Sequence, residues 1–247
     1  MAIEYLGLSN INGPLVVLEG VQDAFFDEIV EFVVDGDTRK MGRIVELDED
    51  KAIIQVFEGT ENMSLNNTNT YLPGRPMEIA VSPEMLGRTF NGVGEPIDEL
   101  GPIFSDDMRD VNGLPLNPVR REYPRNYIRT GISAIDGLTT LIRGQKLPIF
   151  SGNGLPHDQL AAQIVKQASL GEDSEEEFAI VFGAMGVKHD VAEFFRKTFE
   201  ESGVSDHVAM FLNLANDPVV ERLITPKVAL TVAEYLAFEC NMHILVI

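Results

Sequence analysis

The spacing of apolar residues changes partway along the chain, and this change constrains the fold more than any other feature of the sequence. Up to about residue 72, short apolar runs are cut by turns; the runs lie at 14–18, 28–34, 39–47 and 51–57. After Thr130, apolar runs of strand length alternate with stretches that repeat apolar residues every three or four positions. The first pattern predicts antiparallel strands, and the second predicts a parallel sheet sandwiched by helices.

The first 72 residues are expected to form a small antiparallel β-barrel. Asp35-Gly36-Asp37 and Asp48-Glu49-Asp50 separate successive apolar runs, and such short polar breaks are typical of tight hairpins. Closing the sheet into a barrel removes its exposed edges and so pairs the backbone groups of its edge strands, which favours a barrel. We therefore predict a barrel domain over 1–72.

Residues 73–124 are rich in proline and glycine, and we interpret them as a connector. The segment Phe90-Asn91-Gly92-Val93-Gly94-Glu95-Pro96 contains a Gly-x-Gly sequence. Without a preceding strand and a following helix, such a sequence is typical of a turn rather than of a phosphate loop.

Residues 125–247 are expected to form an α/β domain. Predicted strands cover 147–150, 178–182, 208–214 and 242–247. Predicted helices cover 158–169, 190–202 with Gly203 as the stop, and about 226–239 after helical turns from Asp217. The sequence ends on its last apolar residue without a further helix, which we interpret as an α/β domain that is incomplete at the C-terminus.

The amino-acid composition and net charge disfavour several classes of binding partner and of functional site. A chain of 247 residues with 45% hydrophobic residues can supply two domain cores. With 19 basic and 39 acidic side chains the net charge is −20, which disfavours nucleic acid and anionic lipid surfaces as ligands. A single cysteine, Cys240, excludes an internal disulfide, offers no cysteine cluster for a metal and is typical of a cytosolic protein. We expect no metal site, no export signal and no insertion into the membrane.

The octapeptide Ser151-Gly152-Asn153-Gly154-Leu155-Pro156-His157-Asp158 lies where a predicted strand meets a predicted helix, the position of a phosphate-binding loop. A working loop has the form G-x-x-x-x-G-K-[ST], in which backbone N–H groups and the lysine hold phosphates and the hydroxyl holds magnesium. At these positions the chain has Ser151, Pro156, His157 and Asp158. Every defining residue of the loop is therefore altered.

Each alteration acts against phosphate binding. Pro156 has no N–H to donate, His157 is mostly neutral at cytosolic pH, and Asp158 adds a negative charge, although it could cap the helix or hold magnesium directly. The combined deficit is about 3–5 kcal/mol, or about a hundred- to a few thousand-fold in affinity. We expect ATP or ADP with magnesium to bind weakly or not at all at residues 152–158. An ordinary strand–helix turn remains the alternative.

Several longer stretches resemble the non-catalytic B subunits (beta chains) of vacuolar/archaeal-type (V/A-type) rotary ATPases. The variant loop Ser-Gly-x-Gly-Leu-Pro-His is the most specific, and the other stretches are 56–60, 127–138, 143–150, 212–218, 221–222, 233–239 and 242–247. The resemblance implies a RecA-like, P-loop-type nucleotide domain after the barrel. Where catalytic relatives have Gly-Glu-Arg, this chain has Gly186-Val187-Lys188, and valine can neither accept a proton nor orient water.

The resemblance implies that the chain has no catalytic residues of its own and alternates with catalytic A subunits in a heterohexameric ring. It implies contacts with central and peripheral stalk subunits and a cytoplasmic location, peripheral to the membrane through the complex. A complete member would continue beyond Ile247 into the segment whose arginine reaches the neighbouring A subunit, and then into a helical domain.

Two alternatives remain open from the sequence. The chain could be an active nucleotide-binding ATPase subunit in which Asp158 holds magnesium and a protonated His157 replaces the lysine. It could also be a stand-alone interaction module with the same fold. The F-type alpha subunit is a weaker relative, because it would be expected to keep a lysine in the loop.

Overall fold

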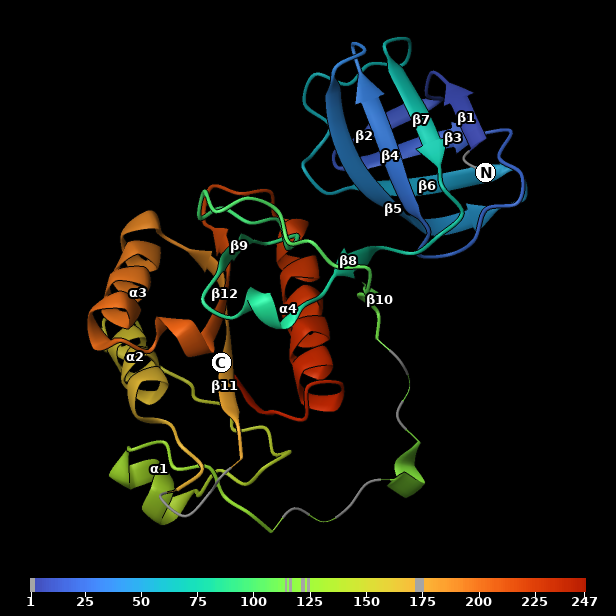
Figure 1. The fold of residues 1–247 in the computed structure, drawn as a ribbon. Helices are drawn as coiled ribbons and strands as arrows, with labels where there is room; N and C mark the ends of the chain where they lie inside the picture. Colours follow the sequence, from blue (N-terminus) through green and yellow to red (C-terminus); the bar gives the residue numbers. More distant parts are fainter. Residues whose placement is uncertain (1–2, 114, 116, 121–122, 124, 172–175) are drawn as a thin grey trace.

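The computed structural model describes residues 3–113, 115, 117–120, 123, 125–171 and 176–247. A curled antiparallel sheet forms one end of the molecule, and a parallel sheet with helices on both faces forms the other (Figure 1). The predicted fold class is confirmed: a barrel-type domain precedes an α/β domain. Within the described residues, no helix is long and apolar enough to cross a membrane.

The barrel domain contains seven strands in the order β1-β7-β4-β5-β6-β3-β2, and every neighbouring pair is antiparallel. The strands are β1 (Ile3–Leu6), β2 (Asn10–Asn12), β3 (Leu15–Glu19), β4 (Ile29–Val34), β5 (Thr38–Asp48), β6 (Lys51–Val56) and β7 (Thr68–Leu72). Alternate residues of these strands point inward; fully buried examples are Val16, Phe32, Ile44 and Ile54. The predicted hairpin at Asp35-Gly36-Asp37 is present, with φ of 51° at Asp35 and 80° at Gly36.

Strands β1, β2 and β7 were not predicted from the sequence. Strand β7 reads Thr-Asn-Thr-Tyr-Leu, with Thr68 and Thr70 fully buried between β1 and β4. Because these buried positions carry threonine rather than an aliphatic residue, hydrophobic alternation does not mark the strand.

The α/β domain is built on a four-stranded parallel sheet in the order β13-β11-β12-β9. Its strands are β9 (Thr89–Asn91), β11 (Phe178–Val187), β12 (Val208–Leu214) and β13 (His243–Val246). Helix α4 (Glu221–Phe238) covers one face, and α2 (His157–Gln167) and α3 (His189–Ser202) cover the other (Figure 1). The predicted helix at 190–202 is confirmed with its stop, since Gly203 has φ of 72° and caps α3.

The predicted strand at 147–150 is wrong. These residues have no strand structure, and the Ile149 and Phe150 side chains are 50% and 92% exposed. A strand forms only where a neighbour accepts and donates backbone hydrogen bonds, and Pro148 removes one donor from a run of four residues. An apolar run of this length is therefore insufficient to identify a strand.

The segment interpreted as a connector, 73–124, also contributes to the sheet. Its strand β9 pairs with Met210–Leu212 of β12, while β8 (Glu78–Ala80) pairs with β10 (Met108–Asp110). The shorter helices η1 (Pro83–Met85), η2 (Pro118–Arg120), α1 (Ser133–Leu138) and η3 (Ser205–His207) complete the described elements. The Gly-x-Gly segment after β9 forms a turn as predicted, with the Gly94 N–H bonded to the Asn91 carbonyl at 3.1 Å.

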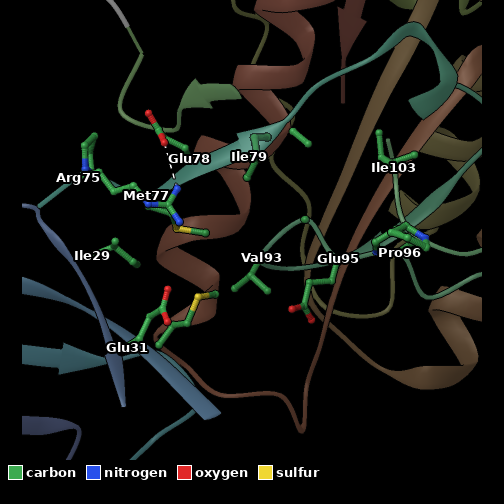
Figure 2. Close-up of a pocket in the computed structure, with 15 residues that line it drawn as sticks. Ile29, Glu31, Arg75, Met77, Glu78, Ile79, Val93, Glu95, Pro96 and Ile103 are labelled. Atoms are coloured by element: carbon green, nitrogen blue, oxygen red, sulfur yellow. Dashed lines mark hydrogen bonds and ion pairs between the residues drawn. The ribbon is translucent and has the colours of Figure 1, made fainter. Parts of the chain in front are cut away.

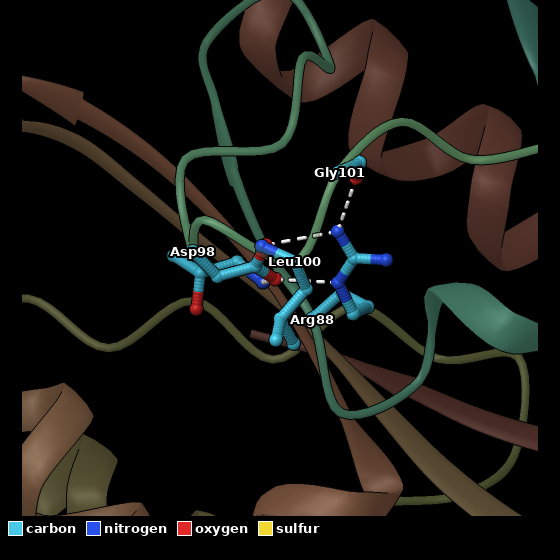
Figure 3. Close-up of polar contacts among 5 residues, drawn as sticks. Arg88, Asp98, Leu100 and Gly101 are labelled. Carbon is cyan, nitrogen blue, oxygen red and sulfur yellow. Dashed lines mark hydrogen bonds and ion pairs between the residues drawn. The ribbon is translucent and has the colours of Figure 1, made fainter.

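A partly buried ion pair holds the segment around β9 in place. The Arg88 guanidinium donates to Asp98 through Nε at 2.5 Å and Nη2 at 2.8 Å, and Nη2 also donates to the Gly101 carbonyl (Figure 3). Asp98 further accepts the backbone N–H groups of Thr89 and Leu100. The Arg88 hydrogen bonds lower the pKa of Asp98 to about 2.

The helix expected from Pro226 begins five residues earlier, at Glu221, and runs through Pro226 to Phe238. Proline cannot donate a backbone hydrogen bond, so α4 loses one bond in its second turn. Nine of its residues are buried, and this packing against the sheet outweighs the loss.

Candidate functional site

The candidate phosphate loop, residues 151–158, forms a turn that is closed by its own backbone. Gly154 has φ of 82°, a left-handed conformation that favours glycine. The Leu155 N–H donates to the Gly152 carbonyl at 3.3 Å, and the His157 N–H donates to the Leu155 carbonyl at 2.9 Å. A glycine at 154 therefore allows this turn.

The start of α2 offers few backbone donors to an anion. Pro156 is the N-cap residue and carries no N–H, and the N–H of His157 is already bonded within the turn. In a phosphate loop these N–H groups would point at the ligand. The turn therefore lacks two of the donors that a phosphate cradle requires.

The prediction that Asp158 caps the helix is wrong. The cap position falls on Pro156, and Asp158 lies in the first turn of α2 without a side-chain cap bond. A carboxylate there still interacts favourably with the helix dipole. Negative charge at the same place opposes the approach of phosphate.

Side chains of the loop face solvent. Residues 151–157 are all exposed, and the His157 side chain is 53% exposed. Its Nε2 lies 3.5 Å from the Asp158 Oδ1, a contact that becomes an ion pair only if the imidazole is protonated. The residues predicted to form a degenerate nucleotide site are Gly152, Asn153, Gly154, Leu155, Pro156, His157 and Asp158; the first six are exposed, and Asp158 is half-buried in the first turn of α2.

The strand predicted at 178–182 does not end at Phe182 but continues to Val187. Residues 183–187 belong to β11, which pairs with β12 as far as Leu214 and contains a bulge between Met185 and Val187. Gly186 lies in the bulge with φ of 67°. The strand continues because β12 supplies backbone partners beyond Phe182.

Val187 occupies the position where catalytic relatives are expected to carry glutamate. Its side chain packs against the apolar cluster shared by β11, α2 and α3, and Lys188 begins the turn into α3. Valine suits this apolar environment, and its side chain has no group that could activate water.

An unanticipated polar network lies at the carboxyl ends of β11 and β12. The Asn213 Oδ1 accepts the Gly186 N–H at 3.2 Å and the Arg222 Nε–H at 3.0 Å. Arg222 Nη2 also donates to the Ala215 carbonyl at 2.9 Å. Parallel sheets place their functional sites at the carboxyl ends of their strands, so a site is expected at this edge.

Glu221 borders the same network and is 8% exposed. Burial raises the pKa of Glu221 to about 7, the negative charges of Asp217 and Glu58 add to this rise, and the Asn213 amide opposes it. A buried carboxyl group with a raised pKa is a signal of function that composition and motif spacing do not give. In the part of the chain that the structure describes, no group of three or more metal-ligating side chains could hold a metal ion.

Comparison with known proteins identifies the family. Residues 8–68 match the β-barrel domain of the ATP synthase alpha/beta family, and residues 131–247 match its nucleotide-binding domain. The chain belongs to the ATP synthase alpha/beta family. The barrel and the α/β domain described above are its two matched domains.

Similar members of the ATP synthase alpha/beta family carry V-type and A-type names. The chain is 62% identical to the V-type ATP synthase beta chain 2 of Clostridium tetani over all of its length, and 59% identical to the V-type ATP synthase beta chain of Halothermothrix orenii over 99% of it. It is 55% identical to the B subunit of the A-type ATP synthase of Aeropyrum pernix over 99% of its length. These relatives confirm the resemblance to V/A-type B subunits. The chain spans about half of their length, 52–54%.

Proposed function

We propose that this chain acts as the non-catalytic B-type subunit of a V/A-type rotary ATPase. In this role it alternates with catalytic A subunits in a heterohexameric ring, which couples ATP synthesis or hydrolysis to the transport of protons or sodium ions. The names and identities of its relatives support the subunit class. The complex is located on the cytoplasmic side of the membrane, and this chain contacts the membrane sector only through other subunits.

The structure of the 151–158 turn is the observation that carries the non-catalytic part of the proposal. Pro156 supplies no N–H, the His157 N–H is bonded to Leu155, and no lysine is available at the turn. Val187 adds a second, separate loss because it packs against apolar residues where a catalytic subunit would carry a base. Loss of both the phosphate cradle and the base supports a structural and regulatory role.

The barrel has a structural role in this proposal. It forms the part of the ring that tethers neighbouring subunits, while the α/β domain contributes its surface to the interface at which ATP is held by the A subunit. The stalk subunits then contact the assembled ring rather than the isolated chain.

Reconstitution with the A subunit tests the proposal. The full-length protein should show no ATP hydrolysis alone and should form an alternating ring with A that hydrolyses ATP. In that ring, His157→Ala and Asp158→Ala should leave turnover within about twofold of the unsubstituted complex. A loss of tenfold or more in both variants would support the alternative of an active subunit with an unusual loop. A stable monomer that does not bind A would support an independent interaction module.

A further inference from the structure

The sequence contains four Asn-Gly pairs, at 12–13, 91–92, 112–113 and 153–154. An asparagine that precedes a glycine is chemically labile, because the glycine nitrogen can attack the asparagine side-chain amide without hindrance from a Cβ. The attack requires a side chain and a backbone N–H that are both free to move toward each other. The contacts that hold each pair therefore decide whether it reacts in the folded protein.

The Asn91-Gly92 pair is held firmly. The Asn91 Oδ1 accepts the N–H groups of Val93 and Glu95 at 3.1 and 2.8 Å, and its Nδ2 donates to the Glu95 carboxylate at 3.1 Å. Gly92 is buried. Figure 2 shows Val93 and Glu95 at a cavity of about 260 Å³ that Ile29 of β4 also lines, so this turn lies where the two domains meet. The Asn91 amide can turn toward the Gly92 nitrogen only after these hydrogen bonds break.

The Asn112-Gly113 pair is also held. The Asn112 Nδ2 donates to the Asp110 carboxylate at 3.1 Å, and its Oδ1 accepts the Lys227 ammonium at 2.7 Å. The Gly113 N–H, which would have to attack the side chain, donates to the Asp110 carbonyl at 3.1 Å. Both reacting groups of this pair are therefore engaged.

The Asn12-Gly13 pair has a free side chain but a fixed backbone. Among the described residues, neither the Asn12 side chain nor the Gly13 N–H makes a hydrogen bond. Asn12 is the last residue of β2, however, and it pairs with Leu15 of β3 in an antiparallel hairpin. Attack by the Gly13 nitrogen requires rotation about the Asn12 Cα–C bond, which the paired, extended backbone opposes.

The Asn153-Gly154 pair is restrained by none of these contacts. Both residues are exposed. Within the part of the chain that the structure describes, the Asn153 side chain, the Asn153 backbone and the Gly154 N–H make no hydrogen bond. The pair is spanned by one weak turn bond, from the Leu155 N–H to the Gly152 carbonyl at 3.3 Å. The space around Gly154 is open, since an added Cβ would meet no atom within 4 Å. Both reacting groups are therefore free to approach each other.

We propose that Asn153 is a site of spontaneous deamidation, in which the Gly154 backbone nitrogen is the nucleophile and water is the second reactant. The nitrogen bonds to the Asn153 Cγ, the Cγ–Nδ2 bond breaks, and ammonia leaves with the proton that the Gly154 N–H gives up. Water then opens the resulting succinimide ring at one of its two carbonyl groups. Opening at Cγ gives aspartate, and opening at the main-chain carbonyl gives isoaspartate.

The reaction changes both the charge and the backbone of the 151–158 turn. Either product adds one negative charge to a turn that already carries Asp158 at the start of α2, and this charge repels phosphate further. Isoaspartate also lengthens the main chain by one methylene group before Gly154. The reaction depends only on the contacts of the turn, so the proposal does not rest on the role of the chain in a rotary ATPase.

The test follows all four Asn-Gly pairs of the full-length protein during incubation in mildly alkaline buffer. Peptide mapping by mass spectrometry measures the conversion of each asparagine, and methyl transfer by an isoaspartate-specific methyltransferase measures isoaspartate. The same incubation in guanidinium chloride gives the rate of each pair in the unfolded chain. The ratio of the native rate to the unfolded rate removes the effect of sequence neighbours, so Asn91 and Asn112 serve as matched controls within one molecule.

We expect the rate ratio of Asn153 to exceed those of Asn91 and Asn112 on the order of tenfold or more, because the hydrogen bonds of these two residues must break before they react. The ratio of Asn12 should also be lower than that of Asn153. Asn153→Gln should remove most of the methyltransferase signal, since the longer side chain closes a larger ring and does so slowly. A rate ratio for Asn153 no higher than those of the other three pairs, or an unchanged methyltransferase signal in Asn153→Gln, would overturn the proposal.

Discussion

The Arg222 Nε–H donates to the Asn213 Oδ1 at 3.0 Å, and this bond joins the start of α4 to the end of β12. The same oxygen accepts the Gly186 N–H from the bulge of β11, and the guanidinium also reaches the Ala215 carbonyl. The Asn213 oxygen and the Arg222 guanidinium together thus connect β11, β12 and α4 at the carboxyl edge of the sheet. The guanidinium holds several N–H donors in one rigid plane, so it can bond more than one acceptor at once. The single ammonium group of lysine cannot reproduce this arrangement.

Replacing Arg222 with alanine should destabilise the protein by about 2 kcal/mol, because the buried Asn213 oxygen loses a charge-assisted hydrogen bond. Arg222→Lys should recover only part of this loss. Arg196→Ala provides the control, since its pair with Glu193 is about half exposed and such pairs contribute about 0–1 kcal/mol. Urea unfolding measures all three variants. Equal costs for Arg222→Ala and Arg196→Ala would show that the network adds no stability.

Asp98 should contribute stability that is lost in acid. Its pKa falls from 3.8 to about 2 in the folded chain, so the charged form is favoured by folding. The contribution is present above pH 3.8 and disappears as pH falls through about 2; its size is about 2 kcal/mol. Asp98→Asn should therefore lower the free energy of unfolding at pH 7.

The control for Asp98 is Asp107→Asn, whose pair with Arg109 is more exposed. Its effect should stay below about 1 kcal/mol at the same pH. If Asp98→Asn is no more destabilising than Asp107→Asn at pH 7, the Arg88–Asp98 pair does not hold the β9 segment as described.

Two glycines of the 151–158 turn should respond differently to alanine. Gly154 has φ of 82° with open space around it, so Gly154→Ala should cost about 1 kcal/mol through backbone strain alone. Gly152 has no left-handed φ, and an added Cβ would meet only Leu155 Cδ1 at 3.8 Å, an ordinary contact. Gly152→Ala should be neutral within about 0.5 kcal/mol. Thermal melting of the two variants measures the difference. A Gly152→Ala variant that is less stable than Gly154→Ala would contradict this turn geometry.

Gly42 should not tolerate a side chain in the barrel. An added Cβ would lie 2.6 Å from the Gln55 carbonyl oxygen of the paired strand β6, so the backbone would have to shift. Gly42→Ala should cost about 1–3 kcal/mol. Gly183→Ala in β11 is the control, because its nearest neighbours would be at 3.8 and 3.9 Å. A Gly42→Ala variant as stable as Gly183→Ala would contradict the β5–β6 packing.

The spacing of apolar residues along the sequence predicted the helices and strands in which that spacing is regular. The helix at 190–202 carries its apolar residues on one face and ends at Gly203, and the structure has this helix. The strand at 208–214 has six buried residues in succession, as a strand covered on both faces requires. Each of these patterns lies within a single segment, so the element could be predicted without knowing which other segments pack against it.

Other elements depend on partners that lie far away in the sequence. Strand β9 has three residues and exists because β12 pairs with it, whereas 147–150 is more apolar and forms no strand. The Gly183–Val187 segment looks like a turn until β12 supplies a register that runs to Leu214. Hydrogen bonds between distant segments decide these cases, and a single sequence does not specify them.

Only part of the candidate site could be predicted, because residues that are adjacent in the sequence are visible as a motif and residues that meet only in the fold are not. The altered loop at 151–158 was visible because its residues are contiguous and a phosphate loop has a strict sequence requirement. The buried carboxyl group of Glu221 was not visible, since the Gly92 turn that covers it lies 129 positions away and meets it only in the fold. Its burial, rather than its identity, makes Glu221 unusual.

The most direct test of the non-catalytic account is calorimetric titration of magnesium-ATP and magnesium-ADP into the full-length protein, alone and together with the A subunit. The account predicts no measurable heat from the protein alone and nucleotide binding when A is present. Micromolar binding to the protein alone, abolished by His157→Ala, would contradict the interpretation of residues 151–158 as a disabled phosphate loop.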